Sequence, residues 1–438
     1  MTAATIDKRY TWDKHNNLTE RSVSYGQTDS PATQGHWHYE TYRYDPLGQL
    51  TRRLNGFSEE LFLYDEAANL LGHQQQVAFN NQVTTSDAFD YTYDGFGRMA
   101  QRRVRDSAVC QYYQYDAEHR ITAVTFEHDS QGIQRAEYDY DILGRRTVKR
   151  VWQSVQAQRL SQPPAAREPE ETVQFSWNGL RLAGETSSKS AHLTLHYVYN
   201  SGSYNPLARI ECFDHPEKQS TDISYYHVAL NGLPEELTDS QGRIVWHGEY
   251  SLWGKLKREQ QNLRFQGQYF DRETGLHYNT FRYYAPDTGR FTQQDPIGLA
   301  GGLNLYAYVL SPLDWVDPLG LTPCAVSTKK ANSMLDAGTD KVTVKSRSDA
   351  QQLFMDRYVG DGYKNMTGES GPSTKNLMEY LTGNKTKAGT YHWDDVMDPA
   401  NVNRVMGHGP TNPDGALPHL QIHQLDGKVI HIFFPWGS

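Results

Sequence analysis

Aromatic and other apolar residues alternate with polar ones over short stretches through the first two thirds of the chain. In 89–93, Phe-Asp-Tyr-Thr-Tyr, the aromatic residues fall at every second position and share one face of an extended strand. Tyr-Asp pairs recur in this region, and the Asp and the residues after it, which include Gly in three of the five pairs, favour tight turns. Each unit therefore predicts a β-hairpin. The pairs are Tyr44-Asp45, Tyr64-Asp65, Tyr93-Asp94, Tyr115-Asp116 and Tyr140-Asp141, at spacings of 20 to 29 residues.

These hairpins constitute an internal repeat. One hairpin cannot bury its own apolar face, whereas stacked hairpins bury theirs against their neighbours. The repeat therefore predicts an extended antiparallel sheet. Segment 153–174 is rich in Gln, Pro and charged residues and interrupts the pattern, so we expect an exposed loop there.

The pattern changes after Leu321. Ser346 to Asp349 match a helix-capping sequence, and apolar residues at helical spacing predict a helix near 348–358. A second helix is predicted near 373–382, where Gly383 would end it.

Two alternating stretches, 418–424 and 428–434, predict a hairpin around Gly427 near the end of the chain. In the expected register, one face carries Leu420, Ile422, Ile430 and Ile432, and the other carries His419, Gln421, His423 and His431. Residues 322–438 therefore predict a small α+β domain.

Composition limits the number of domains and the candidate partners. A chain of 438 residues with 37% hydrophobic residues predicts two or three folding units. The net charge is -9, but residues 322–438 contain 12 basic and 12 acidic residues, so the acidity belongs to the repeats. A neutral C-terminal segment lacks the cationic excess that dominates phosphate-backbone binding. The sequence contains no run of about 18 apolar residues, so it predicts no membrane-spanning helix. The first residues do not resemble a signal peptide. The three cysteines have no metal or redox spacing.

Asp295-Pro-Ile-Gly-Leu299 and Asp317-Pro-Leu-Gly-Leu321 repeat one five-residue motif. Together with the Tyr-Asp units and the sequence from Gln268, this motif resembles the repeat-associated core of Rhs proteins. The resemblance implies a mainly β fold, a spiralling antiparallel hairpin sheet that forms a shell, followed by a small α+β toxin domain that the shell encloses. The implied boundaries are 1–264 for a partial repeat shell, 265–321 for the core and 322–438 for the toxin.

The resemblance also implies a self-cleaving aspartyl protease within the core. Asp295 and Asp317 would be the catalytic pair, Leu321-Thr322 the scissile bond, and Arg290 a neighbour that keeps one carboxylate ionised. Two close carboxyls have separated pKa values, so one stays protonated while the other activates water. Asp-Pro-x-Gly is also an ordinary turn sequence, which is the structural alternative.

Five of the 17 histidines lie in the last 47 residues. Histidine pairs serve as general base and general acid near neutral pH, as RNA cleavage without a metal requires. We expect His419 and His423 in these roles, with Lys428 or Arg404 stabilising charge and His431 on the same face. His392 and His408 with neighbouring aspartates are a weaker metal-site candidate. A solvated surface histidine is the alternative at each position.

The favoured toxin activity is a metal-independent ribonuclease, which needs no cofactor. The alternatives are an ADP-ribosyltransferase or other NAD-consuming toxin, a DNase that uses a divalent metal, and an inert truncated shell. The resemblance further implies a cognate immunity protein, a component of a secretion apparatus and an RNA substrate as partners. It implies export by a specialised system without a signal peptide, and action in the cytoplasm of a target cell.

Overall fold

The structure is a computed structural model. It describes residues 6–15, 17–26, 37–56, 58–72, 75–78, 80–130, 132–153, 168–256, 261–301, 304–309, 311–321, 325–326, 331–332, 335, 341–344, 347–354, 390–394, 397–398, 401–405, 419–423 and 429–433.

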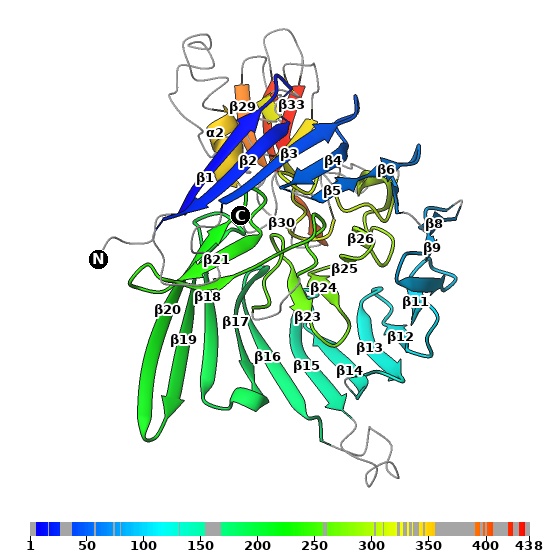
Figure 1. Cartoon of the computed structure of the whole chain (residues 1–438), viewed down its shortest axis with the longest axis vertical. Coiled ribbons are helices and arrows are strands. Elements are labelled where there is room, and N and C mark those ends of the chain that lie inside the picture. The colour runs from blue at the N-terminus through cyan, green and yellow to red at the C-terminus, as the bar shows by residue number, and fades with distance from the viewer. Residues whose placement is uncertain are drawn as a thin grey trace.

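The first strands form an antiparallel sheet, which we call the N-terminal sheet (Figure 1). Its five strands follow one another in chain order, and a two-stranded pair, β6 and β7, comes next. The bounds are β1 (Ile6–Trp12), β2 (Leu18–Tyr25), β3 (Trp37–Tyr44), β4 (Leu50–Asn55), β5 (Ser58–Leu61), β6 (Leu63–Tyr64) and β7 (Leu70–Leu71).

A 15-stranded antiparallel sheet, here the large sheet, takes its strands from β8 to β22 without a crossover. Its order confirms the expected meander of hairpins. The bounds are β8 (Gln76–Val77), β9 (Val83–Thr85), β10 (Phe89–Tyr93), β11 (Met99–Val104), β12 (Cys110–Tyr115), β13 (Ile121–Glu127), β14 (Ile133–Tyr140), β15 (Arg146–Gln153), β16 (Glu171–Asn178), β17 (Arg181–Ser187), β18 (Leu193–Tyr199), β19 (Pro206–His215), β20 (Lys218–Val228), β21 (Pro234–Thr238) and β22 (Ile244–His247). Strand β15 ends at Gln153 and β16 begins at Glu171, so the loop predicted for 153–174 was wrong at Gln153 and from Glu171 onward. Residues 154–167 lie outside the described residues.

The Tyr-Asp units form hairpins for a local reason. In the β14–β15 turn, Asp141 Oδ1 accepts hydrogen bonds from the N–H groups of Leu143 and Arg145, at 2.9 and 3.0 Å. Gly144 adopts φ +78°, a conformation that favours glycine. The same Asp arrangement occurs at Asp13 and Asp239, where no tyrosine precedes it. The aspartate is therefore the common determinant of these turns.

The tyrosine joins each unit to the one before it. Tyr115 Oη donates to the carbonyl of Met99 at 2.8 Å, and Tyr140 Oη donates to that of Ile121 at 2.7 Å. Each acceptor is the first residue of the second strand in the preceding hairpin. Tyr44 and Tyr64 repeat this contact with Leu18 and Leu50. Repetition therefore stacks the hairpins in register.

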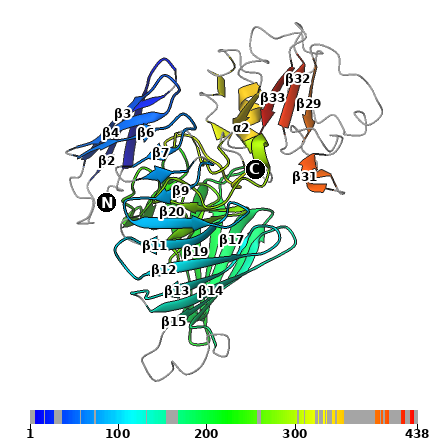
Figure 2. The ribbon, with the colours of Figure 1, turned by 90° about the vertical axis from the view of Figure 1, so that its right-hand side faces the viewer.

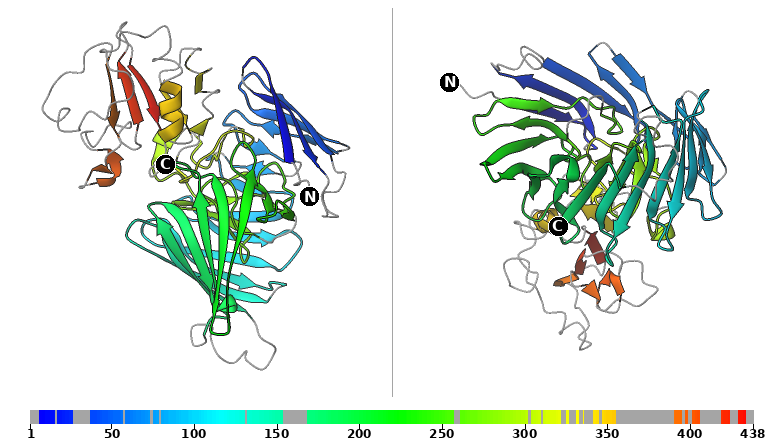
Figure 3. Two further views of the ribbon diagram at one scale, coloured as in Figure 1. Left: turned by 90° about the vertical axis from the view of Figure 1, so that its left-hand side faces the viewer. Right: turned by 90° about the horizontal axis from the view of Figure 1, so that it is seen from below.

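The large sheet curves around segment 261–321 (Figure 3). That segment contains a four-stranded sheet of β23 (Tyr269–Asp271), β24 (Leu276–Asn279), β25 (Arg282–Ala285) and β26 (Arg290–Phe291). Its residues Leu276, Tyr278 and Tyr283 share one buried cluster with inward residues of the large sheet, such as Val124 and Tyr138. The core segment therefore fills the concave face.

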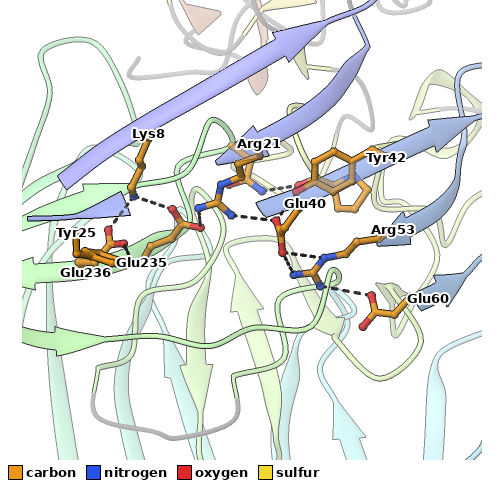
Figure 4. Close-up of polar contacts among 11 residues, drawn as sticks. Lys8, Arg21, Tyr25, Glu40, Tyr42, Arg53, Glu60, Glu235 and Glu236 are labelled. Carbon is orange, nitrogen blue, oxygen red and sulfur yellow. Dashed lines mark hydrogen bonds and ion pairs between the residues drawn. The ribbon is translucent and has the colours of Figure 1, made fainter. Parts of the chain in front are cut away.

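A chain of buried charges joins the N-terminal sheet to β21 (Figure 4). Lys8 Nζ lies 2.7 Å from Glu235 Oε2 and 2.8 Å from Glu236 Oε2. Arg21 Nη2 is 2.5 Å from Glu235 Oε1 and continues the chain toward Glu40 and Arg53. A cavity of about 310 Å³ lies beside these charges. Strands more than 200 residues apart in sequence thus meet through ion pairs.

The C-terminal segment forms a five-stranded sheet in the order β27-β28-β33-β32-β29, with helix α2 (Arg347–Phe354). The strands are β27 (Ala325–Val326), β28 (Lys341–Val344), β29 (Thr390–Asp394), β32 (His419–His423) and β33 (Val429–Phe433), and a separate pair is β30 (Met397–Asp398) and β31 (Asn401–Val405). Leu420, Ile422, Ile430 and Ile432 are buried with Leu353 and Phe354 of α2, which confirms the expected apolar face. No helix among the described residues is long and apolar enough to span a membrane.

The described C-terminal strands lie at the same end of the large sheet as the N-terminal sheet but apart from it (Figure 2). The resemblance implied a toxin enclosed by the shell. In this chain the concave face is already occupied by the core segment, which leaves these strands outside the curve. The helix expected near 373–382 and residues 355–358 of the first helix lie outside the described residues. The boundaries at 264 and 321 stay predictions.

Candidate active site

Asp295 and Asp317 are brought together by one arginine. Arg282, the first residue of β25, is buried with both aspartates inside the core segment. Its Nη2 atom lies 2.9 Å from Asp295 Oδ2 and 3.3 Å from Asp317 Oδ2. The two carboxylates therefore share a single cation, although 22 residues separate them in sequence.

Asp317 lies against the end of the core segment. Its Oδ1 atom accepts hydrogen bonds from the backbone N–H groups of Gly320 and Leu321, at 2.9 and 3.0 Å. Arg282 Nε also donates to the carbonyl of Gly320. Asn279 Nδ2 donates a hydrogen bond to the backbone carbonyl of Asp317 at 3.0 Å and so stabilises the turn. A carboxylate oxygen is thus within 3.0 Å of the Leu321 nitrogen, while Thr322 lies outside the described residues.

Asp295 has the environment of a carboxyl that retains its proton. Burial raises its pKa to about 7, and the charge of Asp317 acts in the same direction. The Arg282 guanidinium and the N–H of Ile297, which donates to Asp295 Oδ1 at 3.0 Å, oppose that rise. Burial also lowers the pKa of Arg282, because its charge is removed from water. The surroundings of Asp295 therefore favour its protonated form.

Arg290 lies elsewhere. We expected it beside one carboxylate, but its Nη2 donates to Asn69 Oδ1 at 2.6 Å and to Asn304 Oδ1 at 3.3 Å. It fastens the core segment to the β6–β7 turn region. Its expected place is taken by Arg282, which was not predicted from the sequence. A usable signal was present, since Arg282 is the one charged residue in the aromatic stretch 281–284, and a buried charge needs a partner.

Two of the C-terminal histidines, His419 and His431, lie close together. His419 is fully buried, and its ring centroid lies 5.2 Å from that of His431 and 4.8 Å from that of Phe433. Pairing of β32 with β33 puts His419, Gln421 and His423 on the face that also carries His431, as expected. Four residues along a strand separate the Cα atoms of His419 and His423 by roughly 13 Å.

The remaining expected residues of the C-terminal segment are less completely defined. His392 is in β29 and Arg404 is in β31. His408 and Lys428 lie outside the described residues. Within the described part of the chain, no group of three or more His, Cys, Asp or Glu residues is arranged to hold a metal ion.

Comparisons with known proteins match two family models to the repeat region of the chain. The model for the Teneurin YD-shell matches residues 4–161, and the model for the RHS protein matches residues 223–260. The double-stranded DNA deaminase toxin A of Burkholderia cenocepacia is 36% identical over 306 residues, which are 64% of this chain and 20% of that protein. Toxin protein Tse5 of Pseudomonas aeruginosa is 30% identical over 329 residues, 64% of this chain and 24% of that protein.

Probable deoxyribonuclease RhsA of Dickeya dadantii is 27% identical over 405 residues, 86% of this chain and 25% of that protein. The chain thus spans a fifth to a quarter of the length of these three relatives. The Tyr-Asp hairpins, the two family matches and the Rhs relative identify the chain as a member of the Rhs repeat family.

Proposed function

We propose that this chain cuts its own backbone between Leu321 and Thr322 and thereby frees residues 322–438 as a toxin. The observation that carries the proposal is the position of Asp317, which shares Arg282 with Asp295 and accepts the N–H of Leu321. A hydrolytic pair of carboxyls needs one protonated member and one ionised member close to the scissile peptide.

The raised pKa of Asp295 supports the following assignment of roles. Protonated Asp295 donates a hydrogen bond to the Leu321 carbonyl oxygen, and ionised Asp317 takes a proton from the attacking water. The water oxygen bonds to the Leu321 carbonyl carbon, and the C–N bond then breaks as the Thr322 nitrogen gains a proton. Arg282 forms ion pairs with both carboxyl groups and holds them in place while proton transfer changes which of the two is negatively charged.

Expression of the full chain tests this proposal. The native chain should give two bands on a denaturing gel, and mass spectrometry should place Thr322 at the new amino terminus. Asp295→Asn and Asp317→Asn should each give one full-length band. Asp287→Asn is the matched control, since this carboxylate pairs with Lys255 at 2.5 Å in the same core segment. Two bands from both active-site variants would contradict self-cleavage.

For the released segment we propose ribonuclease activity without a metal. Support comes from the histidines on one face of β32 and β33, and from relatives whose names refer to enzymes that act on nucleic acid. The full chain, allowed to cleave itself, should degrade purified total RNA in the presence of EDTA. Intact RNA together with consumed NAD would favour the ADP-ribosyltransferase alternative.

A DNase is the second candidate. The alignment with probable deoxyribonuclease RhsA covers 86% of this chain, which is more than the 321 of 438 residues that precede the proposed cleavage site, so it extends into the released segment. Degradation of plasmid DNA only when Mg²⁺ is present, with RNA intact, would favour it. Loss of neither nucleic acid nor NAD would favour an inert shell.

We also propose that the toxin is exported by a specialised secretion apparatus, acts in the cytoplasm of a competing cell and is blocked in the producer by an immunity protein. The toxin names of the relatives support this role. Co-expression of the neighbouring gene should restore the growth of cells that make the full chain. Equal growth with and without the full chain would contradict a toxic role.

A further inference from the structure

The hairpin of β24 and β25 has two faces with different partners. Its register pairs Tyr278 with Tyr283 and Asn279 with Arg282. Paired residues lie on the same face of a sheet, and successive residues of a strand point to opposite faces. The two tyrosines therefore share one face of the hairpin, while Asn279 and Arg282 share the other. All four residues are buried.

The tyrosine face contacts the Tyr-Asp unit that begins at Tyr140. Tyr278 Oη donates to the carbonyl of Gly144 at 3.2 Å and accepts the N–H of Arg146 at 3.0 Å. Tyr283 Oη lies 2.8 Å from Tyr140 Oη. Tyr283 is the donor in that contact, because Tyr140 gives its own proton to a backbone carbonyl. Both phenols thus bind the β14–β15 turn of the large sheet.

The opposite face of the hairpin holds the turn that precedes the proposed cleavage site. Arg282 Nη2 lies 3.3 Å from Asp317 Oδ2, and Asn279 Nδ2 donates to the Asp317 carbonyl at 3.0 Å. At the tip of the hairpin, the N–H of Phe281 donates to the carbonyl of Leu319 at 3.2 Å. A shift of this hairpin relative to the large sheet would therefore carry the Asp317 turn with it.

Asp295 is held by other hairpins of the large sheet. Shortly before it in sequence, Gln293 Nε2 donates to the carbonyl of His119 at 3.2 Å. The carbonyl of Thr292 accepts the N–H of Met99, the first residue of β11, at 3.0 Å. The two aspartates thus depend on different repeat units. Their distances to the arginine that they share are set by how those units stack.

We infer that Tyr278 and Tyr283 are positioning residues for self-cleavage, an inference that rests on the proposed self-cleavage reaction. They fix the β24–β25 hairpin on the β14–β15 turn and so bring Arg282 and Asp317 to Asp295. A misplacement of about 1 Å can slow a reaction about 100-fold. A chain whose repeat hairpins have not yet stacked therefore does not cut itself, and its C-terminal segment stays attached.

The test follows the cleavage of the full chain over time. Pulse-labelled chain from cell-free synthesis is transferred to buffers of different pH and sampled on a denaturing gel. Tyr283→Phe keeps the ring and removes the hydroxyl, and it should slow cleavage about tenfold. Adding Tyr278→Phe should slow it up to about 100-fold. Tyr64→Phe is the matched control, because it removes a repeat hydrogen bond to the carbonyl of Leu50, and it should keep the native rate.

The pH dependence of cleavage separates positioning from folding. The reaction needs protonated Asp295, so the native rate should fall as the pH rises through about 7. The charge of Arg282 lowers the pKa of Asp295, so displacement of Arg282 should move this fall in rate to higher pH. Loss of folding alone would lower the rate and leave the midpoint of the fall unchanged.

A second variant perturbs the same contact from the repeat side. Gly144 has φ +78°, and a Cβ there would lie 3.3 Å from the ring of Phe281 at the hairpin tip. Gly144→Ala should therefore slow cleavage and shift its pH dependence in the same direction. Gly48→Ala is its control, because Gly48 occupies the same position in another unit, with φ +80° and nothing within 4 Å of the added Cβ.

Two results would overturn the positioning role while self-cleavage stands. One is that Tyr283→Phe and Gly144→Ala cut as fast as the native chain. The other is that both cut more slowly with an unchanged midpoint, which would show an effect on folding alone. If the native chain gives one full-length band, self-cleavage itself fails, and the positioning role fails with it.

Discussion

The protonated form of the Asp295 carboxyl stabilises the folded chain. Its pKa is raised from 3.8 to about 7, mainly by burial. The folded chain therefore binds this proton more tightly than the unfolded chain does. The resulting stabilisation is complete below pH 4 and is lost as the pH rises through about 7.

Apparent melting temperatures should show this dependence. Asp317→Asn retains the Asp295 carboxyl and blocks cleavage, and it removes only the smallest of the causes that raise the pKa of Asp295, so burial still raises that pKa. Relative to Asp295→Asn, which lacks the carboxyl, it should lose stability between pH 4 and 7, by at most about 1.4 kcal/mol per pH unit. Equal pH dependence of the two variants would show that Asp295 is ionised in the folded chain.

Gly267 shows how closely the backbone approaches the proposed cleavage turn. Its φ is +79°, and a Cβ there would lie 1.8 Å from the carbonyl oxygen of Pro318. Gly267→Ala should therefore displace the Asp317 turn and abolish self-cleavage, as judged by a single band on a denaturing gel. Gly48→Ala separates the strain of a positive φ from the steric clash, because Gly48 has φ +80° but a Cβ there would meet nothing within 4 Å. Two normal bands from Gly267→Ala would refute this account of the turn.

At the scale of the element, the hairpin depends on the aspartate of its turn. Asp141→Ala removes the acceptors of Leu143 N–H, Arg145 N–H and Arg145 Nε, which lie at 2.9, 3.0 and 2.7 Å. We expect a local loss of about 1 to 3 kcal/mol, seen as faster hydrogen exchange in β14 and β15. Asp139→Ala removes a carboxylate of β14 whose ion pair with Arg150 is half exposed, and should cost under about 1 kcal/mol. Equal exchange in both variants would contradict the role of the turn.

The same scale explains which elements were predictable. Alternation and Asp-Gly turns involve neighbouring residues, so the hairpins at Asp45, Asp94 and Asp141 follow from the sequence. The start of β16 at Glu171 was missed, because its pairing with β15 lies across the intervening segment rather than within a local pattern. The apolar face of the C-terminal hairpin was predicted correctly, since a two-residue period identifies faces without tertiary information.

The whole molecule is joined by charges that are far apart in sequence. Burial opposes ionisation of Glu235, but Arg21 and Lys8 lower its pKa to about 2, below the ordinary value of 4.5. This stabilisation is present above pH 4.5 and is lost as the pH falls through about 2. The contact between the N-terminal sheet and β21 should therefore survive mild acid.

Glu235→Gln should loosen that contact, because Lys8 and Arg21 lose a shared buried partner. Hydrogen exchange in β1 and β2 should accelerate several-fold, and the native chain should show the same protection at pH 5 and pH 7 once intrinsic rates are corrected. Asp7→Asn is the matched control in β1, where the ion pair with Arg9 is largely exposed. Unchanged exchange in Glu235→Gln would mean that apolar packing alone holds the sheet.

The sequence alone predicts the hairpins, their turns and the buried face of the C-terminal strands. The two-residue alternation of apolar and polar positions and the turn aspartate each involve only a few neighbouring residues. Asp295 and Asp317 were found from a repeated motif. Their common partner was not, because Arg282 reaches them only after β25 packs inside the curved sheet. The pairing of the final hairpin with β28 and β29 likewise joins strands that are far apart in sequence. Such contacts arise from packing between distant segments, which no short sequence window contains.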